Sequence, residues 1–175
     1  MKVIKKISGK MKRAYNSYTI GDYMRTAYLS PRRVALITSR FQGKDNVLPV
    51  DWHMPLSFSP KLYCISLESG NYSSEMITAS GCFAVNFMGA EYEEQILACG
   101  KISGRNNDKF SLTGLGKIRA EKVDVPLVEN ALGWLECRLV NTIITGDHTL
   151  FIGEVAAEKE NEAAEEIYHI TSKKL

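Results

Sequence analysis

The sequence predicts a mainly β fold, in which short strands form a closed or nearly closed antiparallel barrel with small flanking helices. Short β-branched, apolar runs bounded by turn residues recur along the chain, and only two segments have the composition and end signals of short helices. The alternation of strand and helix that is typical of a Rossmann domain is absent, as are the Gly-x-Gly-x-x-Gly and P-loop motifs.

The first half of the chain is predicted to contain three strands and a helix. RVALITSR (33–40) is apolar and β-branched and is closed by a polar turn, and KLYCISLE (61–68) repeats that pattern. SSEMITAS (73–80) begins with serines that can cap a helix, and Gly81 follows as a stop signal. CFAVNFMG (82–89) then predicts the third strand.

The second half is predicted to contain one more helix and a long hairpin. EYEEQILACG (91–100) is typical of a short helix that ends at its glycine, and a long polar loop (101–114) follows it. ALGWLECRLVNTIITG (131–146) alternates in part, as a half-buried strand does. The Gly146-Asp147 turn should bring HTLFIGEVAAEK (148–159) back as its antiparallel partner.

Composition favours one domain in the cytoplasm, without a nucleic-acid or membrane partner. The 175 residues are 45% hydrophobic and 24% charged, which suffices for one sizeable core. The net charge of +2 gives no electrostatic case for binding nucleic acid. No apolar run approaches the ~20 residues of a membrane span, and no signal-peptide core follows the basic start. The four cysteines lack the close spacing of zinc or dithiol motifs, so a reducing compartment fits best.

Three segments could together bind a phosphate and a flat heterocycle. The stretch 46–60 is expected to be a loop whose backbone, Trp52 and serines can hydrogen-bond an anion or a ring edge. Ser73 or Ser74 would stand at a helix N-terminus, which attracts phosphate, and Lys109 in the loop 101–114 could add a cation. Taken singly, each also fits an ordinary loop, an ordinary helix cap and a surface lysine.

His148, beside the predicted hairpin turn, is the best candidate for a polar group near a reacting centre, because imidazole titrates near neutrality and can donate to a ligand. An exposed histidine without a role is the alternative. The spacing supports no Ser-His-Asp, Cys-His or paired-carboxylate site, and three scattered histidines predict no metal site.

The order of these segments resembles the flavin reductase-like family, the FMN-binding split barrels that include flavoredoxins and small NAD(P)H:flavin oxidoreductases. The matching segments cover about 31–155, the expected core of one domain spanning 1–175. In family order they are PRRVALITSR, DWHMPLSFSP, YSSEMI, GCFAVNF, SGRNNDKF, LECRLV and GDHTLFIGEV.

The resemblance implies FMN as cofactor, NADH or NADPH as co-substrate, and a homodimer with the flavin at its interface. It assigns the ring and part of the phosphate tail to the stretch from Asn46 to Ser59, and the phosphate to Ser73 and Lys109. His148 matches a histidine near the flavin and the nicotinamide entrance. The cofactor-binding positions are Asn46, Val47, Asp51, Trp52, His53, Ser57, Ser59, Tyr72, Ser73 and Lys109.

Two features depart from the family pattern. Pro49 stands where many relatives carry a threonine or serine, and proline offers neither a hydroxyl nor a backbone N–H. After Val155 the chain continues through an acidic, alanine-rich stretch of helical composition instead of an aromatic final strand.

The predicted architecture is therefore a six- or seven-stranded antiparallel split barrel. The favoured function is hydride transfer from NADH or NADPH to FMN and electron delivery to an acceptor that the sequence does not identify. The main alternative is a non-enzymatic, flavoredoxin-like electron carrier that a partner protein reduces. A nucleic-acid-binding barrel is disfavoured, because the charge is near neutral and no strand face combines aromatic and basic residues.

Overall fold

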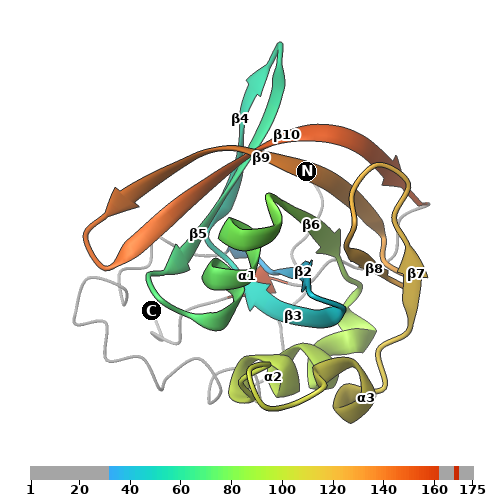
Figure 1. The fold of residues 1–175 in the computed structure, drawn as a ribbon. Coiled ribbons are helices and arrows are strands. Elements are labelled where there is room, and N and C mark those ends of the chain that lie inside the picture. Colours follow the sequence, from blue (N-terminus) through green and yellow to red (C-terminus); the bar gives the residue numbers. More distant parts are fainter. Residues whose placement is uncertain (1–31, 162–167, 170–175) are drawn as a thin grey trace, which may run out of the picture.

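The computed structural model describes residues 32–161 and 168–169 and arranges most of them around one antiparallel sheet (Figure 1). Its strand order is β3-β2-β6-β9-β10-β5-β4. The strands are β2 (Ala35–Phe41), β3 (Lys44–Val50), β4 (His53–Phe58), β5 (Lys61–Glu68), β6 (Cys82–Phe87), β9 (Gly133–Thr145) and β10 (His148–Glu160).

The sheet curls into a barrel that does not close. Only Asp51 and Trp52 connect β3 to β4, yet these two strands stand at opposite ends of the strand order. A short link can join the two ends only if the sheet bends round, and β3 indeed contacts β5 without pairing with it. The prediction of a mainly β, antiparallel split barrel is confirmed.

Alternating residues of β2 serve two cores, which explains why its apolar run has no polar interruption. Ala35 and Ile37 point into the barrel, where they pack with Phe83, Val85 and other interior residues. Leu36, together with Val34 just before the strand, points the other way, into a cluster with α2 and α3. Both faces of this strand are therefore buried.

The helices are short and lie around the barrel: α1 (Tyr72–Ser80), the 3₁₀ turn η5 (Ala90–Tyr92), α2 (Glu93–Lys101) and α3 (Lys109–Thr113). The predicted helix at 73–80 is confirmed and Gly81 ends it, with φ of 72°. The expected serine cap is wrong, because Asn71 Oδ1 accepts the hydrogen bond from the Ser74 N–H. α2 passes through Gly100 and ends one residue later.

Two predicted loops contain regular structure. The stretch 46–60 is mostly β3 and β4, and the loop 101–114 contains α3. Pro49 and Pro55 lie on the two edge strands of the sheet, where proline is tolerated because no second neighbour needs the missing N–H. The short pair β7 (Lys117–Arg119) and β8 (Pro126–Val128), which the sequence pattern missed, covers Cys82 and Ala84 of β6.

The two ends of the described chain meet in a small ladder, in which β1 (Arg32–Arg33) pairs with β11 (Tyr168–His169). β10 runs on to Glu160, so part of the stretch expected to be helical after Val155 is strand. The rest of that expectation lies largely outside the described residues. No helix within the described part of the chain is long and apolar enough to cross a membrane.

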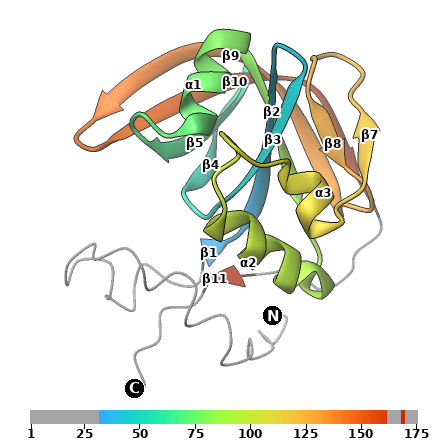
Figure 2. The ribbon, with the colours of Figure 1, turned by 60° about the horizontal axis from the view of Figure 1, so that its bottom comes forward.

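Two hairpins project from the barrel (Figure 1), and Figure 2 shows the one formed by β9 and β10 extending to one side. One is formed by β4 and β5, and Phe58 at its tip is 99% exposed. The other is formed by β9 and β10 and confirms the predicted 131–159 hairpin with its turn at Gly146-Asp147. β5 belongs to both regions, because it pairs with β4 on one side and with β10 on the other.

Candidate functional site

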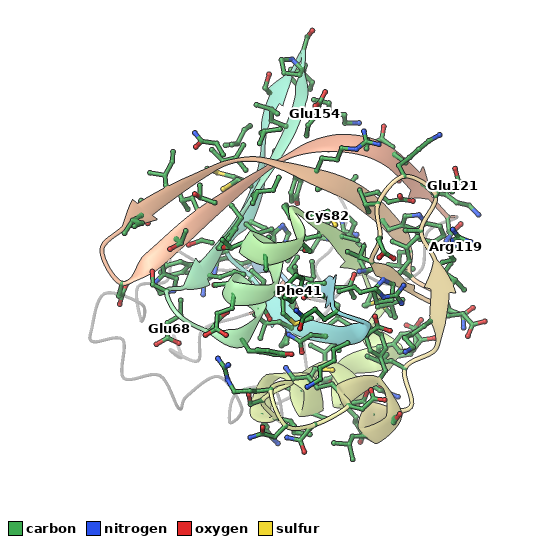
Figure 3. The ribbon with its side chains drawn as sticks, viewed as in Figure 1. Phe41, Glu68, Cys82, Arg119, Glu121 and Glu154 are labelled. Atoms are coloured by element: carbon green, nitrogen blue, oxygen red, sulfur yellow. The ribbon has the colours of Figure 1, made fainter. Side chains whose placement is uncertain are left out.

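Most of the predicted site residues gather at one end of β5. We call the residues Ser66–Glu68, which lead into α1, the α1 end of β5, and Lys61–Tyr63, at the projecting hairpin, its hairpin end. His148 pairs with Glu68, and the Ser66 N–H donates to Trp52 O at 2.8 Å. Figure 3 labels Glu68 beside the turn into α1.

Asn46 and Ser73 meet at the N-terminus of α1. Asn46 Nδ2 donates to Ser73 Oγ at 2.8 Å, which joins the start of β3 to the first turn of the helix. Asn46 is only 1% exposed, and its Oδ1 has no hydrogen-bond partner among the described residues. An unsatisfied buried acceptor costs stability, so this oxygen is suited to receive a ligand's hydroxyl.

The loop between α2 and α3 lies over this pair. A Cβ on Gly104 would stand 2.0 Å from Asn46 Oδ1, so glycine is needed for the backbone to come this close. The neighbouring Arg105 donates from Nη2 to Glu75 Oε1 at 2.7 Å, and its guanidinium lies 5.0 Å from the centre of the Tyr72 ring. The loop thus reaches the first turn of α1 through one charged side chain.

Lys109 is placed differently from the loop cation that the sequence predicted. It is the first residue of α3 and 3% exposed, and its ammonium donates to Val47 O and Cys99 O, each at 2.9 Å. Burial lowers the pKa of this lysine. The side chain ties α2 to β3 beside Asn46, and its direct contact with a phosphate stays a prediction.

Trp52 and His148, which are far apart in the sequence, come together at the α1 end of β5. Their ring centres are 4.8 Å apart with the planes inclined by 32°. His148 Nδ1 lies 2.7 Å from Asp147 Oδ1, and this hydrogen bond lowers the pKa of Asp147. Because an ionised carboxylate only accepts, Nδ1 carries the hydrogen of this bond, and in the matching neutral tautomer Nε2 is the acceptor nitrogen.

Asp51 and His53 flank Trp52 and have protein partners of their own. Asp51 Oδ2 accepts from Arg32 Nε at 3.0 Å. His53 Nε2 lies 3.0 Å from the Arg33 carbonyl and must donate to it, so Nδ1 accepts from the Tyr63 hydroxyl at 2.7 Å. Burial is the largest cause of the lowered pKa of His53. Their contacts with a cofactor stay predictions.

Ser57 and Ser59 lie at the other end of β5. Ser57 pairs with Leu62, and Ser59 stands in the exposed turn after β4. The length of β5 separates them from Ser73, roughly 20 Å at ~3.3 Å per residue. One chain therefore does not bring these two serines to the Asn46–Ser73 pair.

Sequence reasoning missed four residues of this region: Glu75, Gly104, Arg105 and Asp147. Within SGRNNDKF, the sequence resemblance assigns a role only to the lysine. The Gly-Arg pair could have drawn attention, because glycine permits close backbone approach and arginine recognises phosphate. No cluster of metal-binding residues occurs in the described part of the chain.

Comparison with known proteins identifies one family. The model of the flavin reductase like domain matches residues 25–174. An uncharacterized protein from Archaeoglobus fulgidus is 38% identical over 128 residues, which are 73% of this chain and 72% of that protein. The NADH-dependent FMN reductase AsuE2 from Streptomyces nodosus subsp. asukaensis is 29% identical over 143 residues, covering 82% of this chain and 76% of the relative.

Solved structures agree with this match. The flavoredoxin from Methanosarcina acetivorans superposes with a TM-score of 0.72 at 25% identity, covering 83% of this chain and 76% of that one. The flavoredoxin of Desulfovibrio vulgaris (Miyazaki F) superposes with a TM-score of 0.70 at 26% identity, covering 91% and 78%.

Proposed function

The chain belongs to the flavin reductase-like family, and on that premise we propose that it binds FMN and transfers hydride to it from NADH or NADPH, with the electrons passing on to an acceptor. The observation that carries this proposal is the gathering of Asn46, Ser73, Trp52 and His148 at the α1 end of β5. These residues come from four separate segments, and the sequence resemblance assigns each of them to the flavin site.

The Asn46 side of the site suits the phosphate and the sugar chain of FMN. The unsatisfied N–H groups in the first turn of a helix attract an anion, and the hydroxyl of Ser73 can add a donor. Ser73 Oγ already accepts from Asn46, so its own hydrogen is free to donate to a phosphate oxygen. Asn46 Oδ1 is buried and unpartnered among the described residues, and it could accept from a hydroxyl of the ribityl chain once the Gly104 backbone that covers it moves aside.

The Trp52 side suits a planar ring and a nicotinamide. Bound flavin would supply the redox chemistry, since its ring accepts a hydride and releases electrons. Trp52 gives an apolar surface that excludes water, and His148 Nε2 can accept a hydrogen bond from a carboxamide N–H. Asp147 holds the His148 ring in the tautomer that does so. Positioning of this kind controls the rate, because hydride transfer needs reacting atoms within roughly 3–3.5 Å.

A second copy of this chain is proposed to complete the molecule. The edge strand β4 exposes Met54, Leu56 and Phe58, and Leu56, Phe58, Leu62 and Tyr63 line a shallow groove of about 170 Å³ beside it. An apolar edge strand is a site of association, and a twofold dimer is the commonest way to cover it. The four buried free cysteines fit a cytoplasmic location.

Anaerobic spectroscopy tests the proposed activity. The purified protein, loaded with FMN, should show the visible absorbance of oxidised flavin and lose it on addition of NADH or NADPH. Bound flavin that neither nicotinamide reduces would support the electron-carrier alternative. A protein that binds no FMN would refute the proposal.

A further inference from the structure

We propose that Arg105 is a phosphate-binding residue of the flavin site and that Glu75 competes with the phosphate for it. This inference rests on the proposed FMN function and adds a residue that determines the preference for phosphorylated flavins. It predicts that removing either partner of the Arg105–Glu75 pair changes FMN affinity, but in opposite directions.

Arg105 lies close to the proposed phosphate position at the N-terminus of α1. Gly104 packs on Asn46 Oδ1, so the next residue in the chain must lie beside the Asn46–Ser73 pair. The guanidinium of Arg105 sits over Tyr72, the first residue of α1. Its side chain also forms an ion pair with Glu75, in the first turn of the same helix. A cation is therefore held at the end of α1 that already favours an anion.

The burial of Lys109 carries the second step. Its ammonium is 3% exposed and two of its three N–H groups already bind the carbonyls of Val47 and Cys99. Arg105 is exposed, with half of its side chain accessible to solvent. Unlike Lys109, Arg105 can move to an incoming phosphate without breaking buried hydrogen bonds. Its planar fork also matches two phosphate oxygens at once.

Glu75 carries the third step. It lies in the first turn of α1, where its carboxylate neutralises Arg105 and adds negative charge near the proposed phosphate position. The Arg105 guanidinium lowers the pKa of Glu75, so the carboxylate is ionised at neutral pH. A phosphate dianion must displace this carboxylate from Arg105. Until it does so, the negative charge of Glu75 repels the phosphate. Glu75 thus weakens FMN binding while it keeps Arg105 in place.

The test compares FMN and riboflavin, which lacks the phosphate, by titration of flavin fluorescence on the full-length protein. Arg105→Gln should weaken FMN by about 3- to 10-fold and leave riboflavin unchanged, as expected for one exposed charge-assisted contact. Glu75→Gln should strengthen FMN by about 2- to 5-fold and also leave riboflavin unchanged, because a repulsive charge is removed. Arg119→Gln is the matched control, since Arg119 is an exposed arginine on β7, away from α1 (Figures 1 and 3).

The outcomes separate this inference from the proposed function. If the pair is only a structural link between loop and helix, both substitutions shift FMN and riboflavin in the same direction, and the inference is overturned. An unchanged ratio of FMN to riboflavin affinity in Arg105→Gln also overturns it, while FMN binding by the unmutated protein leaves the proposed function standing. An unmutated protein that binds neither flavin removes the proposed function itself.

Discussion

The two ends of β5 differ in how far a single chain completes them. At the α1 end, Asn46, Ser73 and the Gly104 loop close over one another, and Trp52 packs on His148. At the hairpin end, Phe58 is fully exposed and an apolar groove stays open. This difference agrees with the proposal that the α1 end holds the flavin and that the hairpin end meets a second copy of the chain.

This difference divides the predicted flavin residues into two groups. Asn46, Trp52, Ser73 and His148 lie at the α1 end and can act within one chain. Ser57 and Ser59 lie at the hairpin end. Contact of all of them with one flavin would require either a flavin that extends along β5 or hairpin serines from a partner copy.

Lys109→Ala should have the largest effect, because it removes a buried side chain next to the α1 end. The carbonyls of Val47 and Cys99 lose their donor and a cavity opens, so the free energy of unfolding should fall by about 2–4 kcal/mol. FMN affinity should fall by about ten- to a hundredfold and riboflavin affinity far less, if the ammonium also contacts the phosphate.

Urea unfolding without flavin and titrations with both flavins measure these effects separately. Lys101→Ala, which removes an exposed lysine at the end of α2, is the control and should change neither quantity. Equal losses for FMN and riboflavin would show that Lys109 supports the site only through its hydrogen bonds to the two carbonyls.

Phe58→Glu tests the hairpin end. The unmutated protein should run as a dimer of about twice 19.6 kDa in size-exclusion chromatography with light scattering. Burying a charge where Phe58 packs should weaken the dimer by at least ~tenfold, since a buried phenyl group contributes roughly 1.5–3 kcal/mol. Phe41→Glu, on the β2–β3 hairpin, is the control. A stable monomer that still binds FMN tightly would contradict the need for a second chain.

His148→Ala tests whether the α1 end positions the nicotinamide. Flavin absorbance should stay nearly intact, while anaerobic flavin reduction at saturating NADH or NADPH should slow at least ~tenfold, equivalent to about 1.4 kcal/mol of barrier. His148→Asn should be milder, because it keeps a hydrogen-bonding group. Stopped-flow absorbance measures both rates, and an unchanged rate in the alanine variant removes His148 from the mechanism.

The sequence predicts best those elements whose residues make their own pattern. β2, β5 and β6 are rich in apolar, β-branched and aromatic residues, and the Gly146-Asp147 turn marks the long hairpin. The sequence predicts a loop at β4, because an edge strand exposed on both faces shows little apolar alternation and tolerates Pro55. β7 and β8 have three residues each, too few for any periodicity.

The site residues could be grouped from the sequence only through the order of segments that resembles the family. Nothing local to Asn46 indicates Ser73, and nothing local to Trp52 indicates His148, because the curl of the sheet brings them together. Arg105 and Glu75 were missed for a different reason. Both are exposed charges, and surface charges are so common that their pairing across 30 residues leaves no signal in the sequence.

Replacing His53 should give the smallest effect on stability, and it tests the middle of β5, between the α1 end and the hairpin end. It pairs with Ile65 in the middle of that strand, and its ring donates to Arg33 O and accepts from Tyr63. Burial lowers the pKa of His53 below its ordinary 6.5, so the folded protein keeps the ring neutral at pH values where the unfolded chain binds a proton. The unfolded state then holds more protons, and the free energy of unfolding must fall as the pH drops below 6.5, until the folded-state pKa is reached.

The carboxylate of Asp45, whose pKa is also lowered, contributes its own loss of stability only near and below its ordinary 3.8, outside this pH window. Urea unfolding from about pH 7 to about pH 5 should therefore show a slope that His53→Gln reduces, since the amide does not titrate. The same slope in both proteins would mean that the base of the projecting hairpin is open to water, and that the whole of β4 belongs with the hairpin end.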